Sequence, residues 1–152
     1  MSSIIPGVQQ GQIRTLYNEL ARFGENIDTA LISTQPSDTI SAPLLRHARG
    51  MSTQARENGT KIDERLIASE HADNVAADAP AGEGATLVLG LMAENVNRVL
   101  TTAREVFDAD TLKGFFRDAV QPRPGDGAPV DDALRKRAFD DMFQHRLRDL
   151  AP

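Results

Sequence analysis

The expected fold rests on the stretch TLVLGLMAENVNRVLTTAREVF, residues 86–107. Its apolar side chains recur at alternating steps of three and four residues, the spacing of a helix face that packs against another helix. Further apolar residues widen this stripe, so we expect the helix to lie in the middle of the fold. Thr86 is its predicted N-cap. The stripe consists of Leu89, Met92, Val96, Val99, Ala103 and Val106.

Two earlier stretches have the same periodicity. Residues 12–33 predict a helix that ends before Gln35-Pro36, because a residue that precedes proline avoids helical angles. Ser41 is a predicted N-cap for a second helical region over 42–71. Either one long helix accommodates Gly59, at a cost of about 1 kcal/mol, or two helices meet there, and we favour the single helix. The stripe of residues 12–33 consists of Ile13, Leu16, Leu20, Phe23, Ile27 and Ala30.

The C-terminal part predicts a short helix over 111–120, with its cap within residues 108–110, and a last helix from Asp131 to about Leu150. Residues 72–85 are rich in Ala, Gly and Asp and predict a flexible connection. The sequence therefore predicts an all-α bundle of four to five helices with heptad-like seams and a flexible mid-chain connection. We expect one domain, 1–152, and the alternative is a division into helical halves, 8–71 and 86–150, around a hinge at 72–85.

Composition excludes several classes of protein. The 152-residue chain has no cysteine, which excludes disulfides and Cys-ligated zinc, and its net charge of −5 disfavours general binding to nucleic acid. No apolar run approaches the ~18 residues of a membrane span, and residues 1–6 lack the features of a signal peptide. We expect a cytoplasmic protein that does not insert into membranes. Incorporation into a phage, secretion or flagellar assembly stays open, since the residue usage is typical of bacteria or phages.

The search for catalytic chemistry yields one arrangement of interest. Asp141, His145 and Asp149 share a helical face at spacings that could hold a divalent ion. The neighbouring Arg146 and Arg148 favour a solvent-exposed, salt-bridged face instead. No motif of an activated nucleophile or of a phosphate-binding loop is present. We therefore predict no catalytic residue, cofactor, metal or small-molecule substrate, and a protein that is not an enzyme.

A basic face over residues 46–65 is the main alternative. It contains Arg46, Arg49, Arg56, Lys61 and Arg65, which would suit a nucleic-acid-associated regulatory protein. Acidic neighbours such as Asp63 and Glu64 offset this charge, and no aromatic residue lies among the basic ones for base stacking. A solvent-exposed charged face is the favoured interpretation.

The segments 103–107 (AREVF), 112–117 (LKGFFR) and 139–147 (FDDMFQHRL) resemble the rod-binding segment of bacterial flagellar rod-assembly proteins. The resemblance covers about a third of the chain. Asp108 to Asp110 depart from it, because they stand where that segment has an apolar run. The resemblance implies a role in assembly.

The heptad seams themselves have two interpretations. They form the core of a bundle within one chain, or one seam meets a second copy or another protein. The predicted function is that of a non-enzymatic structural, assembly or adaptor protein that acts through its amphipathic helices, with a protein partner or a homo-oligomer. A flagellar, secretion or phage assembly factor is the second alternative. The predicted contact residues are Leu16, Leu20, Ile27, Met142, Phe143 and Leu147.

Overall fold

The computed structural model describes residues 7–73 and 75–143, which fold into α-helices without a strand in those ranges. An isolated β-bridge joins Gln9 to Pro80. The all-α fold predicted from the periodicity is thus confirmed. The helices are α1 (Gln10–Ser33), α2 (Ala42–Asp73), α3 (Glu83–Ala103), α4 (Ala109–Ala119) and α5 (Asp132–Met142).

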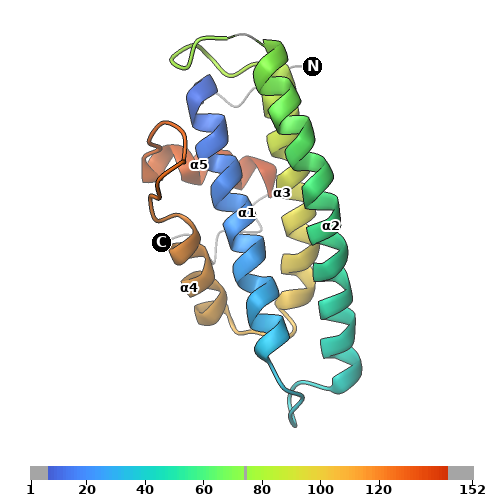
Figure 1. Ribbon diagram of the computed structural model, residues 1–152. Coiled ribbons are helices and arrows are strands. Elements are labelled where there is room, and N and C mark those ends of the chain that lie inside the picture. Colours follow the sequence, from blue (N-terminus) through green and yellow to red (C-terminus); the bar gives the residue numbers. More distant parts are fainter. Residues whose placement is uncertain (1–6, 74, 144–152) are drawn as a thin grey trace.

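The three long helices form an antiparallel bundle, in which α1, α2 and α3 all pack against one another (Figure 1). Helix α4 returns along α1, and α5 lies across the bundle and contacts α3. Helix α3 therefore has a central place, as predicted, although α1 also packs against three helices.

The heptad seams close on one another inside this bundle. Every member of the α3 stripe is buried, and so is the α1 stripe apart from Ala30, which is half-buried. Burying an aliphatic side chain contributes about 1.5–3 kcal/mol, so these stripes supply most of the driving force for folding. Of the two interpretations of the seams, the structure shows the core within one chain.

Helix α2 is continuous through Gly59, as the favoured alternative had it. The Ser41 hydroxyl accepts a hydrogen bond from the Leu44 amide at 3.2 Å, which confirms the predicted cap. A Cβ at position 59 would lie 3.8 Å from Met92 Cε, an ordinary contact distance. The glycine is therefore not required by close packing between α2 and α3.

The predicted limits of α3 were wrong at both ends. The helix begins at Glu83, after the N-cap Gly82, and the Thr86 hydroxyl donates to the Gly82 carbonyl instead of capping. The glutamate in the first turn favours this early start, because it complements the positive end of the helix dipole. At the other end the chain turns after Ala103, which places Phe107 edge-on to Phe115 of α4 with ring centroids 5.5 Å apart.

Both predicted acidic caps further along the chain are present. Asp108 accepts from the Thr111 amide, so α4 begins at Ala109, two residues before the predicted start at 111, and it ends at Ala119. Asp131 accepts from the Leu134 amide and begins α5. The last helix ends at Met142 within the described residues, and the rest of its predicted span, beyond Phe143, lies outside them.

The connection between α2 and α3, predicted as a flexible hinge, is fixed to the start of α1. Gly11 donates to the Ala77 carbonyl at 2.9 Å, and Ala81 donates to the Val8 carbonyl at 3.0 Å. The first bond satisfies an amide that the N-terminus of α1 would leave unpaired. Flexibility of this connection stays a prediction.

No helix within residues 7–73 and 75–143 has the length and apolar character needed to cross a membrane.

Candidate functional site

The predicted contact residues lie inside the protein. Leu16, Leu20 and Ile27 are fully buried, Phe143 is 1% exposed, and Met142 is half-buried against the core. Phe143 ends a row of edge-on aromatic rings that starts at Phe23 and runs through Phe116 and Phe139. Leu147 lies outside the described residues. A partner could reach the buried residues only if the bundle opened, so their role in binding stays a prediction.

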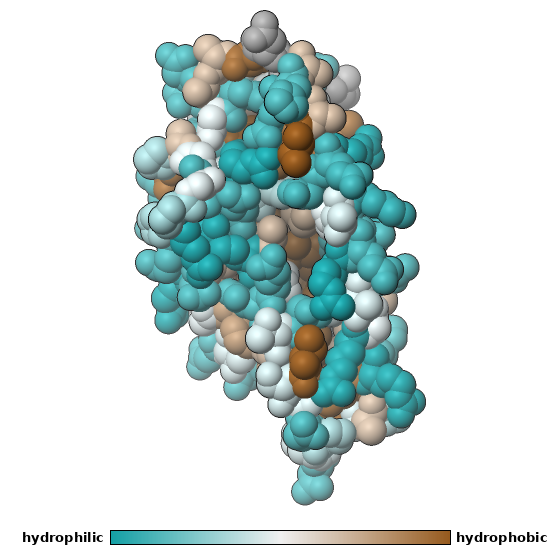
Figure 2. All heavy atoms as spheres, viewed as in Figure 1, coloured by the Kyte–Doolittle hydropathy of each residue, from teal (hydrophilic) through white to brown (hydrophobic). Residues whose placement is uncertain are grey.

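A pocket of about 320 Å³ opens between α1 and α2, with α3 as its floor. Figure 2 shows this hollow, with apolar atoms in its depth. Small residues flank it on both helices, namely Ala21 and Gly24 on α1 and Ala55 and Gly59 on α2. Because these side chains are too short to meet, the two helices leave an open space above α3. The floor consists of Met92, Asn95, Val96 and Val99.

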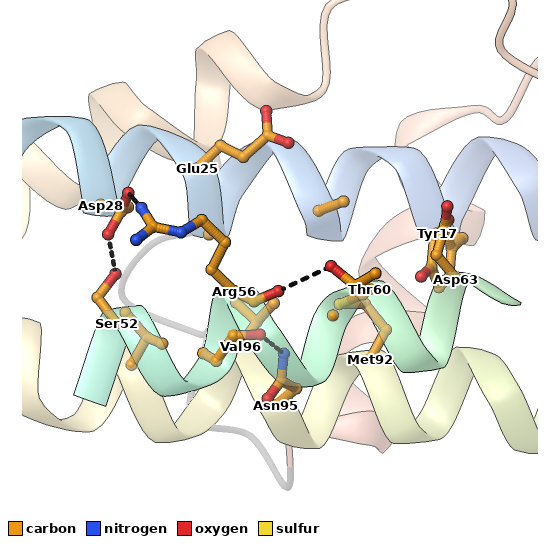
Figure 3. Close-up of a pocket in the computed structure, with 15 residues that line it drawn as sticks. Tyr17, Glu25, Asp28, Ser52, Arg56, Thr60, Asp63, Met92, Asn95 and Val96 are labelled. Carbon is orange, nitrogen blue, oxygen red and sulfur yellow. Dashed lines mark hydrogen bonds and ion pairs between the residues drawn. The ribbon is translucent and has the colours of Figure 1, made fainter. Parts of the chain in front are cut away.

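One end of the pocket has a closed set of polar contacts. The Asp28 carboxylate accepts from the Ser52 hydroxyl at 2.7 Å and pairs with the Arg56 guanidinium at 2.7 Å (Figure 3). Both charged groups have their partner, so this end fixes α1 to α2 and offers little to a ligand.

The other end contains a polar group without a partner. Tyr17 is 2% exposed, and its hydroxyl has no hydrogen-bond partner among the described residues. Asp63 lies beside it (Figure 3). Burial raises the pKa of the Tyr17 phenol, and the charge of Asp63 and its close approach to the hydroxyl raise it further, although the two groups form no hydrogen bond of normal geometry.

Asp63 has unused capacity to accept hydrogen bonds. Its side chain is 51% exposed, and its contact with a cation is a long one, 3.9 Å from Arg14. That guanidinium forms two hydrogen bonds with Glu70 and lies over the Tyr17 ring, 5.7 Å from the centroid. Arg14 is thus oriented by Glu70, and it leaves the Asp63 carboxylate open toward the pocket.

The basic face of residues 46–65 is only partly available. Arg49 donates to the Leu31 and Thr34 carbonyls at the end of α1, and Arg56 pairs with Asp28. Lys61 and Arg65 are exposed and line a shallower hollow of about 220 Å³ between α2 and α3, together with Arg98. Two of the five basic residues are therefore engaged in holding helices together.

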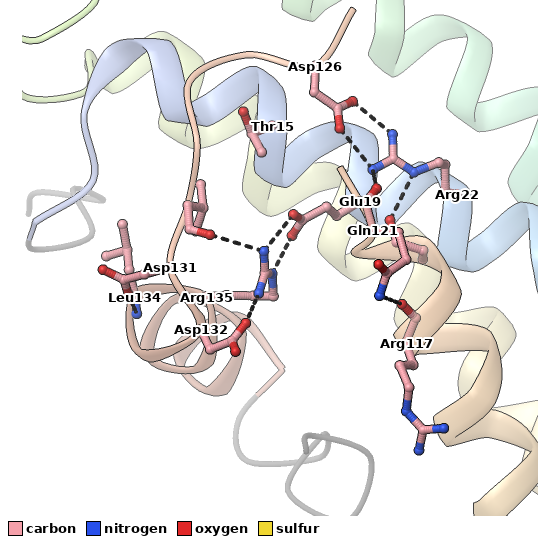
Figure 4. A network of polar contacts seen from close by, with 12 residues as sticks. Thr15, Glu19, Arg22, Arg117, Gln121, Asp126, Asp131, Asp132, Leu134 and Arg135 are labelled. Atoms are coloured by element: carbon pink, nitrogen blue, oxygen red, sulfur yellow. Dashed lines mark hydrogen bonds and ion pairs between the residues drawn. The ribbon is translucent and has the colours of Figure 1, made fainter. Parts of the chain in front are cut away.

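A second polar cluster holds the C-terminal part against α1 (Figure 4). The Arg135 guanidinium forms two hydrogen bonds with the buried Glu19 carboxylate, at 2.8 and 3.0 Å. Burial raises the pKa of Glu19, and Arg135 acts in the opposite direction. Arg22 binds Asp126 in the loop before α5 and holds the pKa of that carboxyl below its usual range. These pairs are saturated, so we interpret the cluster as structural.

No group of three or more His, Cys, Asp or Glu residues within 7–73 and 75–143 is placed to hold a metal ion. His47 and His71 are exposed on α2. The predicted alternative of a metal at Asp141, His145 and Asp149 falls mostly outside the described residues.

Sequence reasoning overlooked Tyr17, Asp28 and Asp63, which belong to no known catalytic pattern. A usable signal was present. Ala21 and Gly24 on one helix, and Ala55 and Gly59 on the next, place small residues at helical spacing beside a seam. Such pairs either allow helices to approach closely or leave a gap, and here they leave a gap.

Comparison with protein-family models, with curated proteins and with solved structures finds no match to this chain.

Proposed function

We propose that the protein is a non-enzymatic adaptor or assembly factor that binds a protein partner in the pocket between α1 and α2. The observation that carries this proposal is the open pocket above the apolar seam of α3. Met92, Val96 and Val99 of the α3 seam lie at the pocket floor, each only 2–4% exposed, and the small residues of α1 and α2 leave an open volume above them. Sites that combine an apolar surface with a few fixed polar groups are typical of specific binding.

The remaining apolar surface is less suited to this role. The large exposed side chains lie on four separate segments, namely α1 (Ile32), α2 (Ile67), the connection after it (Val75) and α3 (Leu87). Single exposed apolar residues are ordinary on soluble domains. The pocket is therefore the better candidate for a contact surface.

A different protein suits the negative charge of the pocket better than a second copy of this chain does. The chain carries a net charge of −5, and acids outnumber bases in the pocket lining, where Glu25, Asp28 and Asp63 accompany one base, Arg56. Two copies would repel each other at such a surface, whereas a basic segment of another protein would be attracted. Self-association is thus an outcome that the measurements below can detect.

Site-specific photo-cross-linking tests the proposal. A photoreactive residue in place of Thr60, which is exposed and lines the pocket, should form a discrete covalent adduct in cells of the source organism. The matched control is Gln54, which is exposed on the same helix and does not line the pocket. The adduct should be absent at position 54.

A blocking variant makes this test specific. Gly59→Leu fills the pocket and should abolish the adduct at position 60, and Gly50→Leu should not, because no atom lies near position 50. Adducts of equal yield at positions 54 and 60, or an adduct that persists in Gly59→Leu, would contradict the proposal. So would the absence of any adduct.

The hollow lined by Lys61, Arg65 and Arg98 supports a second candidate, a nucleic-acid-associated regulator. Binding of short DNA at low salt that weakens with Lys61→Glu and steeply with added salt would support it. No binding at low salt would remove it. A flagellar, secretion or phage setting for the proposed adaptor remains a prediction from the sequence.

A further inference from the structure

We propose that the pocket between α1 and α2 receives a lysine or arginine side chain from a basic segment of the partner. Its aliphatic stem lies on Met92 and Val96, and its cationic head pairs with the half-exposed Asp63 carboxylate next to the Tyr17 hydroxyl. This inference rests on the proposed function and names the group that the site recognises.

The Tyr17 hydroxyl is the first observation. A buried hydroxyl without a partner costs about 1–3 kcal/mol, and buried polar atoms in native proteins almost always have a partner. Tyr17 is 2% exposed and lines the pocket, and its oxygen is unpaired among the described residues. The oxygen has less than 1 Å² of accessible surface, so a ligand N–H in the pocket would satisfy it only after the side chains over it shift.

The negative charge of Asp63, next to the Tyr17 hydroxyl, determines that the ligand is a cation. Asp63 keeps a half-exposed carboxylate whose nearest cation, Arg14, is 3.9 Å away and is bound by Glu70. Arg56 neutralises Asp28 at the far end of the pocket. A carboxylate or phosphate would be repelled beside Asp63, whereas an ammonium or guanidinium group gains an ion pair there.

The shape of the pocket determines the size and the apolar part of the ligand. The floor between the two polar ends is mainly apolar, with Met92 and Val96 below Gly24 and Gly59, and its one amide, Asn95, donates to the Ala55 carbonyl. A volume of about 320 Å³ lies at the lower limit of ligand sites, which suits one long side chain better than a bulky molecule. Long cationic side chains bury their methylene stems on apolar surface and keep the charge at a polar edge.

The test is an NMR titration of the isotope-labelled full chain, in which the chemical shifts of the backbone amides are monitored. The probes are the Nα-acetyl N-methylamides of lysine and arginine, with the norleucine derivative as an uncharged control of similar stem. We expect the cationic probes to shift the amides of Gly59, Thr60 and Asp63 and to bind about fivefold more tightly than norleucine. Equal affinities for all three probes would overturn the inference.

Variants locate the cation. Asp63→Asn and Tyr17→Phe should each weaken binding of the lysine probe several-fold, and circular dichroism would show that both remain folded. Glu64→Gln is the matched control, since Glu64 is exposed and does not line the pocket. Equal losses in Glu64→Gln and Asp63→Asn would show a general attraction to an acidic surface and would overturn the assignment.

A free polyamine is the other source of the same chemistry, and spermidine therefore serves as a third kind of probe. Binding of spermidine without binding of the amino-acid derivatives would overturn the assignment to a protein side chain. If the adduct at position 60 forms and the cationic probes do not bind, this inference fails alone. If the probes bind and the adduct is absent, the proposed function fails.

Discussion

At the scale of single residues, the inference about the pocket depends on the Tyr17 hydroxyl. Its ring packs in the core, but its hydroxyl is buried without a partner among the described residues. A hydroxyl that served stability alone would be hydrogen-bonded. The proposed contact with a partner accounts for this cost.

This interpretation predicts an unusual mutational result. Tyr17→Phe removes an unsatisfied polar atom and leaves the ring in place, so the free energy of unfolding should stay within about 0.5 kcal/mol or increase. Urea denaturation followed by circular dichroism measures it. A loss of more than about 1 kcal/mol would show that the hydroxyl stabilises the isolated fold.

Asp126 predicts a specific pH dependence. Arg22 lowers its pKa in the folded protein, so its contribution is present above the ordinary aspartate pKa of about 4 and is lost as the pH falls through the folded-state value. Asp126→Asn should therefore destabilise the protein at pH 6 and have a smaller effect at pH 3.

Denaturation in urea at the two pH values would measure this difference. Asp38→Asn is the control, because Asp38 is exposed and has no ion pair among the described residues. A deficit of Asp126→Asn that is the same at pH 6 and pH 3 would contradict the assigned role of the pair.

At the scale of the helices, one buried ion pair links α5 to α1. Glu19 is 3% exposed, and Arg135, which reaches it from α5, is 8% exposed. Removing one member of such a pair leaves an uncompensated buried charge, and Arg135→Met should cost about 3 kcal/mol. The double variant Glu19→Met/Arg135→Met should recover much of that loss.

A double-mutant cycle of unfolding free energies measures the coupling between these two side chains. The single variant Glu19→Met completes the cycle. Additive losses in the double variant would show that the pair is not what attaches α5 to α1.

The helices themselves were largely predictable, because periodicity and caps are local properties. The stripes of residues 12–33 and 86–107 and the caps Asp108 and Asp131 were correctly assigned. The start of α3 was not, because Thr86 is as good a local candidate for the N-cap as Gly82, although Glu83 suits the first turn of a helix. The Gly82 amide is satisfied by the Gln10 side chain, a contact between residues far apart in sequence.

At the scale of the whole molecule, local pattern could not locate the pocket. Whether Ala21, Gly24, Ala55 and Gly59 form a close contact or a gap depends on how α1 and α2 are rotated over α3. The same limitation explains why the predicted contact residues lie in the core. A heptad stripe does not encode whether its partner helix belongs to the same chain.

The central claim is that the apolar seams pack against one another within one chain. The pocket is then the proposed surface for contact with a partner. Sedimentation equilibrium from about 1 µM to several hundred µM, with helix content measured in parallel, tests this claim most directly. We predict the mass of a single 152-residue chain throughout, with unchanged helicity. A dimer or larger species that loses helix content as it dissociates on dilution would contradict it, because the seams would then be shared between chains.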